Sequence, residues 1–204
     1  MTLRTGLTQQ ENERRPLEFT PAVIARNAAL VALALSAAAQ VSVPLGGVAA
    51  PFTLQSLAVV LAGAIAGARA GTLGILVYLF VGAIGLPVFA NGASGSDVLT
   101  GPTAGFLWVF LLIPTPLAHL ARRVDGSWSG IWFGAFLAAH MALLLLGFLW
   151  SALPSGDFGA FASWGAYLPG AVLKSMLGVF VLRFMPTHVT RSASRRRPRI
   201  GPDA

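Results

Sequence analysis

The chain has 204 residues, of which 55% are hydrophobic and only 10% are charged. A soluble domain carries about a quarter charged residues, so this composition excludes an ordinary soluble protein and indicates one that lies in lipid. There is no cysteine, which excludes disulfides, thiolate metal sites and thiol nucleophiles.

Long apolar runs alternate with short polar segments along the chain. A helix needs about 20 apolar residues to cross the hydrocarbon of a bilayer, and we expect six transmembrane helices. The predicted spans are 22–40, 52–68, 71–87, 102–121, 129–150 and 166–185. We therefore predict an all-α integral membrane protein. A polar cytoplasmic segment over 1–20 precedes the six-helix domain over 21–186, and a basic, disordered cytoplasmic tail follows over 187–204.

The arginines predict the orientation of this bundle. All of them precede or open span 1, fall between spans 2 and 3 or between spans 4 and 5, or lie at the end of span 6 and beyond. The remaining loops, 41–51, 88–101 and 153–163, contain no Lys or Arg. Because basic residues stay on the cytoplasmic side, we expect both termini there and a multi-pass protein of the cytoplasmic (inner) membrane.

The arginines on the cytoplasmic side also explain the net charge of +7. The basic tail is expected to contact anionic membrane lipid, and no nucleic acid is expected as a partner. Whether the chain forms a homo-oligomer is left open.

Lys174 is the only lysine and lies inside the last apolar run. Pro169 suits the first turn of that helix, which places Lys174 about 8 Å from its start. Gly170 and Gly178 lie four residues to either side, on the same face, and small residues line helix contacts in membranes. We expect Lys174 to face the bundle and a ligand; the alternative is that its ammonium group snorkels to the outer interface.

No acidic residue within the predicted spans can pair with Lys174. The acids between residues 19 and 200 are Asp97, Asp125 and Asp157. The partner is therefore expected to be a ligand carboxylate, a carbonyl group, or Asp97 or Asp157 from a folded loop.

Other polar and aromatic candidates cluster toward the outer side. Asn91 lies in the glycine-rich loop 88–101, which can fold over a cavity. Thr53 and Gln55 stand at the outer start of span 2, where Thr53 is a ligand candidate or simply a helix cap. Trp164 and Tyr167 flank the last outer loop and either line a pocket or belong to an interfacial aromatic belt.

His140 is the only histidine deep within a predicted span. As an intramembrane ionisable group it is a functional candidate, but we favour a neutral ring that is hydrogen-bonded to a backbone carbonyl. The sequence has no HExxH motif, no paired carboxylates within a span and no phosphate-binding loop. We therefore expect no enzymatic activity, no metal and no cofactor.

The segment "APFTLQSLAVVLAGAIAGARAGTLGILVYLFVGAIGLPVFANGASGSDVLTGPTAGF" resembles the central signature of the BioY family. "TLQ", "LAG…G.R.G", "Y…GA.GLPVF" and "GPT.G" match in order, and the resemblance covers roughly residues 22–185. BioY proteins are the biotin-specific S components of energy-coupling-factor (ECF) vitamin transporters.

The resemblance implies a function, a fold and partners. It implies six helices with a vitamin site near the outer face, closed by the loops between spans 1 and 2 and between spans 3 and 4. It also implies docking on a membrane T subunit driven by two ATPase subunits, since nothing in this chain hydrolyses ATP. The alternatives are a transporter of another small vitamin or carboxylate, and a membrane assembly subunit that transports nothing.

The same resemblance assigns roles to particular residues. Lys174 falls on the family lysine that holds the polar groups of biotin, and Asn91 falls in a loop that reaches the ligand. The family pattern Pro-Gly-Asp-x-x-Lys has Ala171 here in place of its aspartate. Either Asp97 or Asp157 then substitutes for that acid, or binding is weaker, or the ligand differs.

Overall fold

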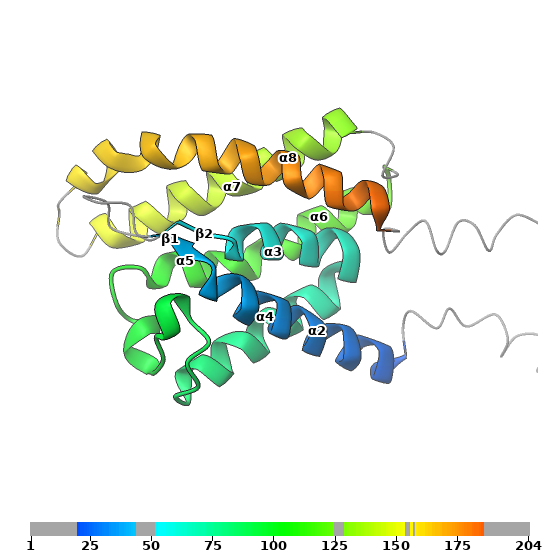
Figure 1. The fold of residues 1–204 in the computed structure, drawn as a ribbon, viewed down its shortest axis with the longest axis horizontal. Coiled ribbons are helices and arrows are strands. Elements are labelled where there is room, and N and C mark those ends of the chain that lie inside the picture. Colours follow the sequence, from blue (N-terminus) through cyan, green and yellow to red (C-terminus); the bar gives the residue numbers. More distant parts are fainter. Residues whose placement is uncertain (1–19, 44–51, 125–128, 154–155, 157, 186–204) are drawn as a thin grey trace, which may run out of the picture.

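The computed structural model describes residues 20–43, 52–124, 129–153, 156 and 158–185. These residues form an all-helical bundle with one very small sheet (Figure 1). The predicted polar N-terminal segment and the basic tail lie outside the described residues, apart from residue 20 at the end of the first of them.

Five helical segments among the described residues are long and apolar enough to cross a membrane. They are Pro21–Gln40, Gln55–Ala83, Ala104–Ala121, Ser129–Ala152 and Trp164–Phe184. The prediction of an all-α membrane protein is confirmed. The count differs from six because no loop separates the predicted second and third spans, which form one helical run of 29 residues.

A change of direction at Gly67 divides this run. It comprises α3 (Gln55–Leu61), a π-helical turn η2 (Ala62–Ala66) and α4 (Gly67–Ala83). Gly67 has φ 83° and ψ 170°, a conformation that suits glycine because it has no Cβ. From this point α4 runs back in the direction opposite to α3 (Figure 1). A single residue thus replaces the loop that the sequence pattern suggested.

Small residues allow the neighbouring backbones to approach closely at this reversal. A Cβ atom added to Gly71 would lie 3.2 Å from the carbonyl oxygen of Ala62. One added to Gly63 would lie 2.7 Å from Cα of Pro114, at the start of α6 (Pro114–Ala121). Side chains at these positions would separate the helices.

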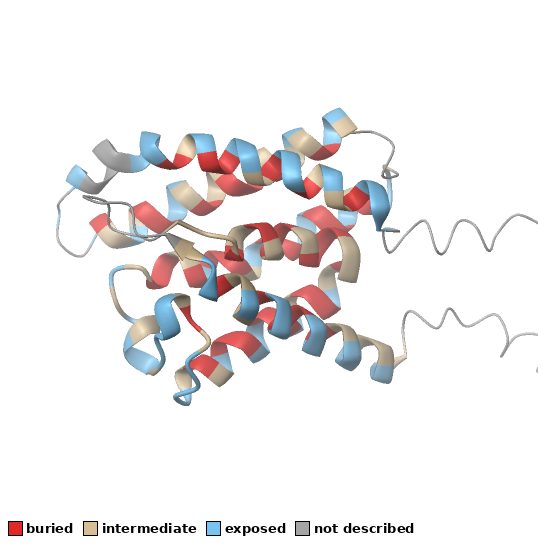
Figure 2. Ribbon diagram, viewed as in Figure 1, coloured by how far each residue is buried: buried red, intermediate tan, exposed pale blue. Residues whose placement is uncertain are grey.

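The remaining helices complete the bundle around this reversal. α2 (Pro21–Gln40) packs along α4, α5 (Ala104–Val109) packs along α7 (Ser129–Ala152), and α7 packs along α8 (Leu168–Phe184). A 3₁₀ turn, η5 (Phe110–Leu112), joins α5 to α6. Buried residues follow the inward faces of the helices and exposed ones the outward faces (Figure 2), as expected for helices whose outer surface meets lipid.

The start of the predicted second span is not helical. Phe52–Thr53 forms β2, which pairs antiparallel with β1 (Ser42–Val43), in the register Ser42 with Thr53 and Val43 with Phe52. The helical part of this span therefore begins at Gln55, slightly later than the approximate predicted bound. The hydrophobic run continues through these residues, so hydropathy alone does not reveal the strand.

The connecting segments gather at one end of the bundle. This end carries β1, β2, the start of α8 and the short 3₁₀ turns η3 (Ala90–Gly92) and η4 (Ser96–Leu99) (Figure 1). The start of α2 and the end of α8 lie at the opposite end.

Candidate functional site

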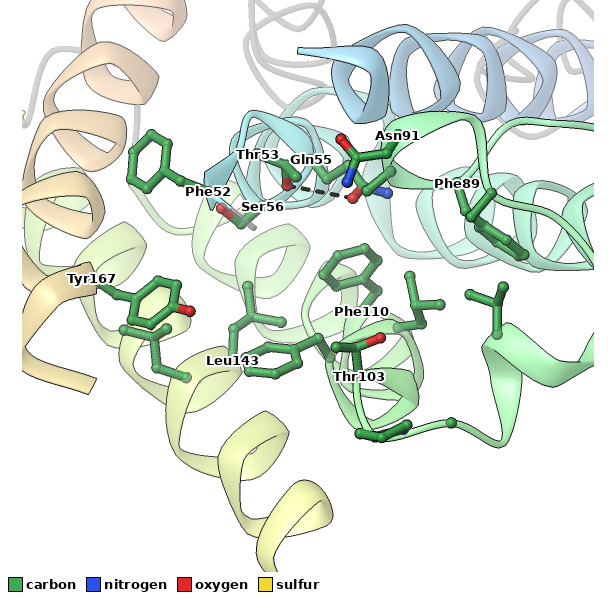
Figure 3. A pocket seen from close by; sticks show the side chains of 18 of the residues that line it. Phe52, Thr53, Gln55, Ser56, Phe89, Asn91, Thr103, Phe110, Leu143 and Tyr167 are labelled. Carbon is green, nitrogen blue, oxygen red and sulfur yellow. Dashed lines mark hydrogen bonds between the residues drawn. The ribbon is translucent and has the colours of Figure 1, made fainter. Parts of the chain in front are cut away.

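A cavity of about 480 Å³ lies among the connecting segments and the helices beneath them. Its walls come from β2, α3, η3, η4, α5, α7 and α8. Figure 3 shows Thr53, Gln55 and Ser56 on one side and Phe110, Leu143 and Tyr167 on the other. The size and the mostly apolar lining are typical of a small-molecule site with a few polar anchors.

Lys174 lies in this cavity and is held on its inner wall. Its Nζ donates hydrogen bonds to the Ser56 hydroxyl at 2.8 Å and to the Thr53 carbonyl oxygen at 3.2 Å. The same nitrogen lies 4.4 Å from the centre of the Phe52 ring, a favourable cation–π distance. The prediction that Lys174 faces the bundle is confirmed, and in this structure its ammonium group is held there by β2 and α3.

Glycines on α8 make room for these contacts. A Cβ at Gly170 would collide with the Phe52 ring, and one at Gly178 would press on the Phe136 ring. Both glycines are buried, so the spacing in the sequence correctly indicated the inward face of α8.

No carboxylate offsets the charge of Lys174 in the part of the chain that the structure describes: its recorded contacts are a hydroxyl, a carbonyl and a ring. Ala171, three residues earlier, is 3% exposed and lines the same cavity with a methyl group. Asp97 also lines the cavity, whereas Asp157 lies outside the described residues. A bound anion would therefore meet an ammonium group already removed from bulk water.

Gln55 and Thr53 both line the cavity, and their contact with a ligand remains a prediction. The Gln55 amide donates to the Tyr78 hydroxyl, and the Thr53 hydroxyl lies 3.3 Å from the Gln55 carbonyl oxygen (Figure 3). Thr53 makes no side-chain hydrogen bond that caps α3. The structure therefore does not support the alternative that Thr53 is a helix cap. The Gln55 side chain is hydrogen-bonded to Tyr78 of α4, so its amide is part of the structure of the cavity wall.

Asn91 lies at the mouth of the cavity, and its side chain is exposed. Its φ of 60° and ψ of 26° are left-handed, a region that asparagine adopts more readily than most residues. Gln40, at the end of α2, lies 3.3 to 3.4 Å from the carbonyl oxygens of Val88 and Phe89 and donates to them. Phe89 itself is buried edge-on against Tyr78, with ring centres 5.3 Å apart.

Two tryptophans hold the far part of the same loop. Trp108 of α5 donates its ring N–H to the Leu99 carbonyl at 2.9 Å, and Trp150 of α7 donates to the Gly101 carbonyl at 3.2 Å. Their ring nitrogens position the loop that forms the cavity mouth.

The structure separates the two aromatic candidates. Tyr167 is 6% exposed and lines the cavity, whereas Trp164 is 38% exposed and is not among the lining residues. The role expected for Trp164 remains a prediction.

The lining also includes Phe52 and Ser56, which the sequence did not single out, and His140, for which a structural role was favoured. Phe52 and Ser56 flank the "TLQ" motif, which was the available signal. For His140 the backbone bond was expected, and it is confirmed by the 2.8 Å contact between Nδ1 and the Phe136 carbonyl oxygen. Its position on the face shared with buried Phe136 and Leu143 was the signal for the cavity.

These features define a multi-pass helical membrane protein with a cavity of small-molecule size near one end. The chain belongs to the BioY family, whose model matches residues 14–191, as the sequence motifs suggested. It is 34% identical over 152 residues to "Biotin transporter BioY" of Rhizobium etli, covering 69% of this chain and 80% of that protein. It is 41% identical over 106 residues to "Biotin transporter BioY" of Thermotoga maritima, covering 52% of this chain and 60% of that protein.

A solved structure has the same fold. The S-component for biotin from an ECF-type ABC transporter superposes with a TM-score of 0.69 at 23% sequence identity, over 79% of this chain and 89% of that one. The likeness concerns the arrangement of the helices.

Proposed function

We propose that this chain binds biotin and carries it across the membrane as the S component of an ECF-type transporter. The observation that carries the proposal is the Lys174 ammonium group, which lies in an apolar cavity without a carboxylate partner among the described residues. Family membership supports the ligand, since the relatives above are biotin transporters by name.

The cavity has apolar walls for the apolar parts of biotin and polar side chains for its polar groups. The ring system and the valeryl chain are largely apolar, and Phe106, Phe110 and Leu143 supply matching walls. Lys174 donates hydrogen bonds to an oxygen of the ligand, and Asn91 closes the mouth. Thr53, Gln55 and Tyr167 complete the proposed site, with Trp164 and Asp157 as outer candidates.

We propose six crossings with both termini cytoplasmic. The reversal at Gly67 divides the 29-residue run into two antiparallel parts, and α2 starts at the end of the bundle where α8 stops (Figure 1). All the arginines among the described residues lie in the terminal turns of these outer helices or beside the turns at the same end: Arg26, Arg69, Arg122, Arg123 and Arg183. The positive-inside rule makes that end cytoplasmic, so the cavity faces outward.

An ECF module is the proposed source of energy, with a T subunit and two ATPase subunits. The solved structure of similar fold is an S-component of such a transporter. On α2, Ala28 and Ala32 are buried, whereas Ala25 and Ala29 are exposed. This exposed pair of small residues is the proposed docking face, because such residues let helices approach closely.

Equilibrium binding of radiolabelled biotin to the purified protein in detergent tests the proposal. We expect saturable binding that Lys174→Ala abolishes or strongly weakens. Arg183→Ala, which removes an exposed charge at the far end of the same helix, should bind like the wild type. A folded, monodisperse wild-type protein that binds no biotin would overturn the assignment.

A second candidate, a transporter of another small carboxylate, is favoured by Ala171. Its methyl group lines the cavity one turn before Lys174, where the family resemblance leads us to expect an acid. Ala171→Asp should tighten biotin binding if biotin is the ligand, because the new carboxylate accepts its N–H groups. A competition panel of small carboxylates separates the two candidates. If a carboxylate unlike biotin displaces radiolabelled biotin at a lower concentration than unlabelled biotin does, the second candidate is favoured.

A further inference from the structure

His140 has a buried polar atom that nothing described in the chain uses. The side chain is 2% exposed and lines the cavity. Its Nε2 is shielded from water and has no hydrogen-bond partner among the described residues. An unsatisfied buried polar atom is costly, roughly 1–3 kcal/mol, so its presence at a ligand cavity calls for a functional reason.

The other ring nitrogen shows which atom carries the proton. Nδ1 lies 2.8 Å from the Phe136 carbonyl oxygen, and a carbonyl can only accept a hydrogen bond. Nδ1 therefore carries hydrogen. Because Nδ1 is protonated in either state of the ring, the neutral ring has its lone pair on Nε2.

Ser175 holds the ring in this state. Its hydroxyl donates to the Ala171 carbonyl at 2.7 Å, and its oxygen lies 3.1 Å from His140 Nδ1. With its hydrogen directed at Ala171, the oxygen presents lone pairs to the Nδ1 hydrogen. Ser175 is fully buried, so α7 and α8 both hold the Nδ1 edge of the ring, while Nε2 lies at the opposite edge.

Lys174 and His140 both line the cavity. The cavity wall around α8 thus combines a donor, Lys174 Nζ, with an acceptor, His140 Nε2, and the methyl group of Ala171 lies on the same wall.

We infer that His140 is a specificity-determining residue whose Nε2 accepts a hydrogen bond from an N–H group of the ligand, beside the oxygen that Lys174 binds. The pair selects a group that has N–H next to C=O, as in a cyclic urea. A small rotation of the ring, to expose Nε2, accompanies binding. The inference rests on the proposed function, since the ureido ring of biotin supplies the N–H and the C=O.

The experiment pairs two variants with three ligands. Binding of biotin, and of two analogues methylated on one or the other ureido nitrogen, is measured for the wild type and for His140→Leu. We expect His140→Leu to weaken biotin binding roughly 3- to 10-fold. It should not weaken further the binding of the analogue whose methyl group blocks the bonded N–H.

His119→Leu is the matched control. His119 makes the same kind of contact to the carbonyl four residues earlier, Thr115, at 2.7 Å, but is exposed and away from the cavity. It should bind all three ligands like the wild type. His140→Gln, which keeps an acceptor, should recover part of the affinity lost in His140→Leu.

The outcomes separate this inference from the proposed function. If the wild type binds no biotin, the proposed function fails first. If the wild type binds and His140→Leu lowers affinity equally for all three ligands, or not at all, the inference is overturned and the histidine is purely structural. If His140→Leu does not fold, the affinities of the wild type for the three ligands test the inference. An equal affinity for biotin and both methylated analogues would overturn it.

Discussion

The two ends of the cavity present polar groups in different ways. At the inner end, Lys174, Ser56 and His140 come from helices and are buried or half-buried. At the mouth, Asn91 and Asp97 come from short 3₁₀ turns and are exposed. A hydrogen bond at the inner end is made away from water and is worth more than one at the mouth, where water competes.

The mouth is nevertheless firmly attached. Gln40, Trp108 and Trp150 donate to backbone carbonyls at three places along the loop, and Phe89 is buried beneath it. Under the proposed function, we expect the inner end to supply most of the binding affinity and the mouth to set the shape of the cavity.

The largest effect is expected at the inner end. Lys174→Ala removes a charged donor and should weaken biotin binding by roughly 10- to 150-fold, from the 1.5–3 kcal/mol of such a bond. Asp97→Ala, at the mouth, should change it by less than about threefold, because the carboxylate is solvated. Equilibrium and dissociation-rate measurements on both variants check this, and equal losses would remove the contrast between the two ends.

Detaching the mouth should have the next largest effect. In Gly82→Leu the new side chain collides with the Phe89 ring, which lies against Gly82. We expect a loss of stability of about 1–3 kcal/mol from overpacking, with weaker binding, because the loop must move. Gly134→Leu is the control, since an added Cβ there meets nothing within 4 Å. Thermal unfolding should leave that control unchanged, and equal losses in both would indicate a general intolerance of α-helical substitutions.

Asn91 allows backbone and side-chain roles at the mouth to be separated. Asn91→Ala should cost about 1 kcal/mol because alanine disfavours the left-handed conformation, whereas Asn91→Gly keeps that conformation. If the amide contacts the ligand, both variants should bind biotin a few-fold more weakly. If only the backbone matters, Asn91→Gly should bind like the wild type, as titration calorimetry will show.

The smallest effect is expected for Gln40→Ala. Its bonds to the Val88 and Phe89 carbonyls are long, at 3.4 and 3.3 Å, and partly exposed. We expect a loss of about 0.5 kcal/mol, visible as faster amide exchange in residues 88–93. Unchanged exchange there would mean that Phe89 alone holds this part of the loop.

The sequence predicted the helices and the inner face of α8 because those features depend on local periodicity. Gly170 and Gly178 lie four residues to either side of Lys174, and the structure has both against aromatic rings. The position of Lys174 followed from them. Motif order also predicted the family.

Contacts between distant segments could not be predicted in this way. The pairing of Phe52–Thr53 with Ser42–Val43 lies within a run whose hydropathy suits a helix. The turn at Gly67 needs only one residue, so the sequence did not reveal that spans 52–68 and 71–87 form one continuous helical run. His140 and Ser56 join the cavity through packing of α3, α7 and α8, which no single-helix pattern reveals.

The early reversal at Gly67 has an electrical consequence. The cavity reaches Ser56, and from Ser56 to Ala66 the helix rises only about 15 Å, whereas the surrounding hydrocarbon is about 30 Å thick. Val59, Val60, Ala62 and Ala64 fill this stretch and are buried. When the cavity holds water, the insulating layer beneath it is about half as thick as the lipid, so the transmembrane voltage falls more steeply through these small side chains than through the bilayer.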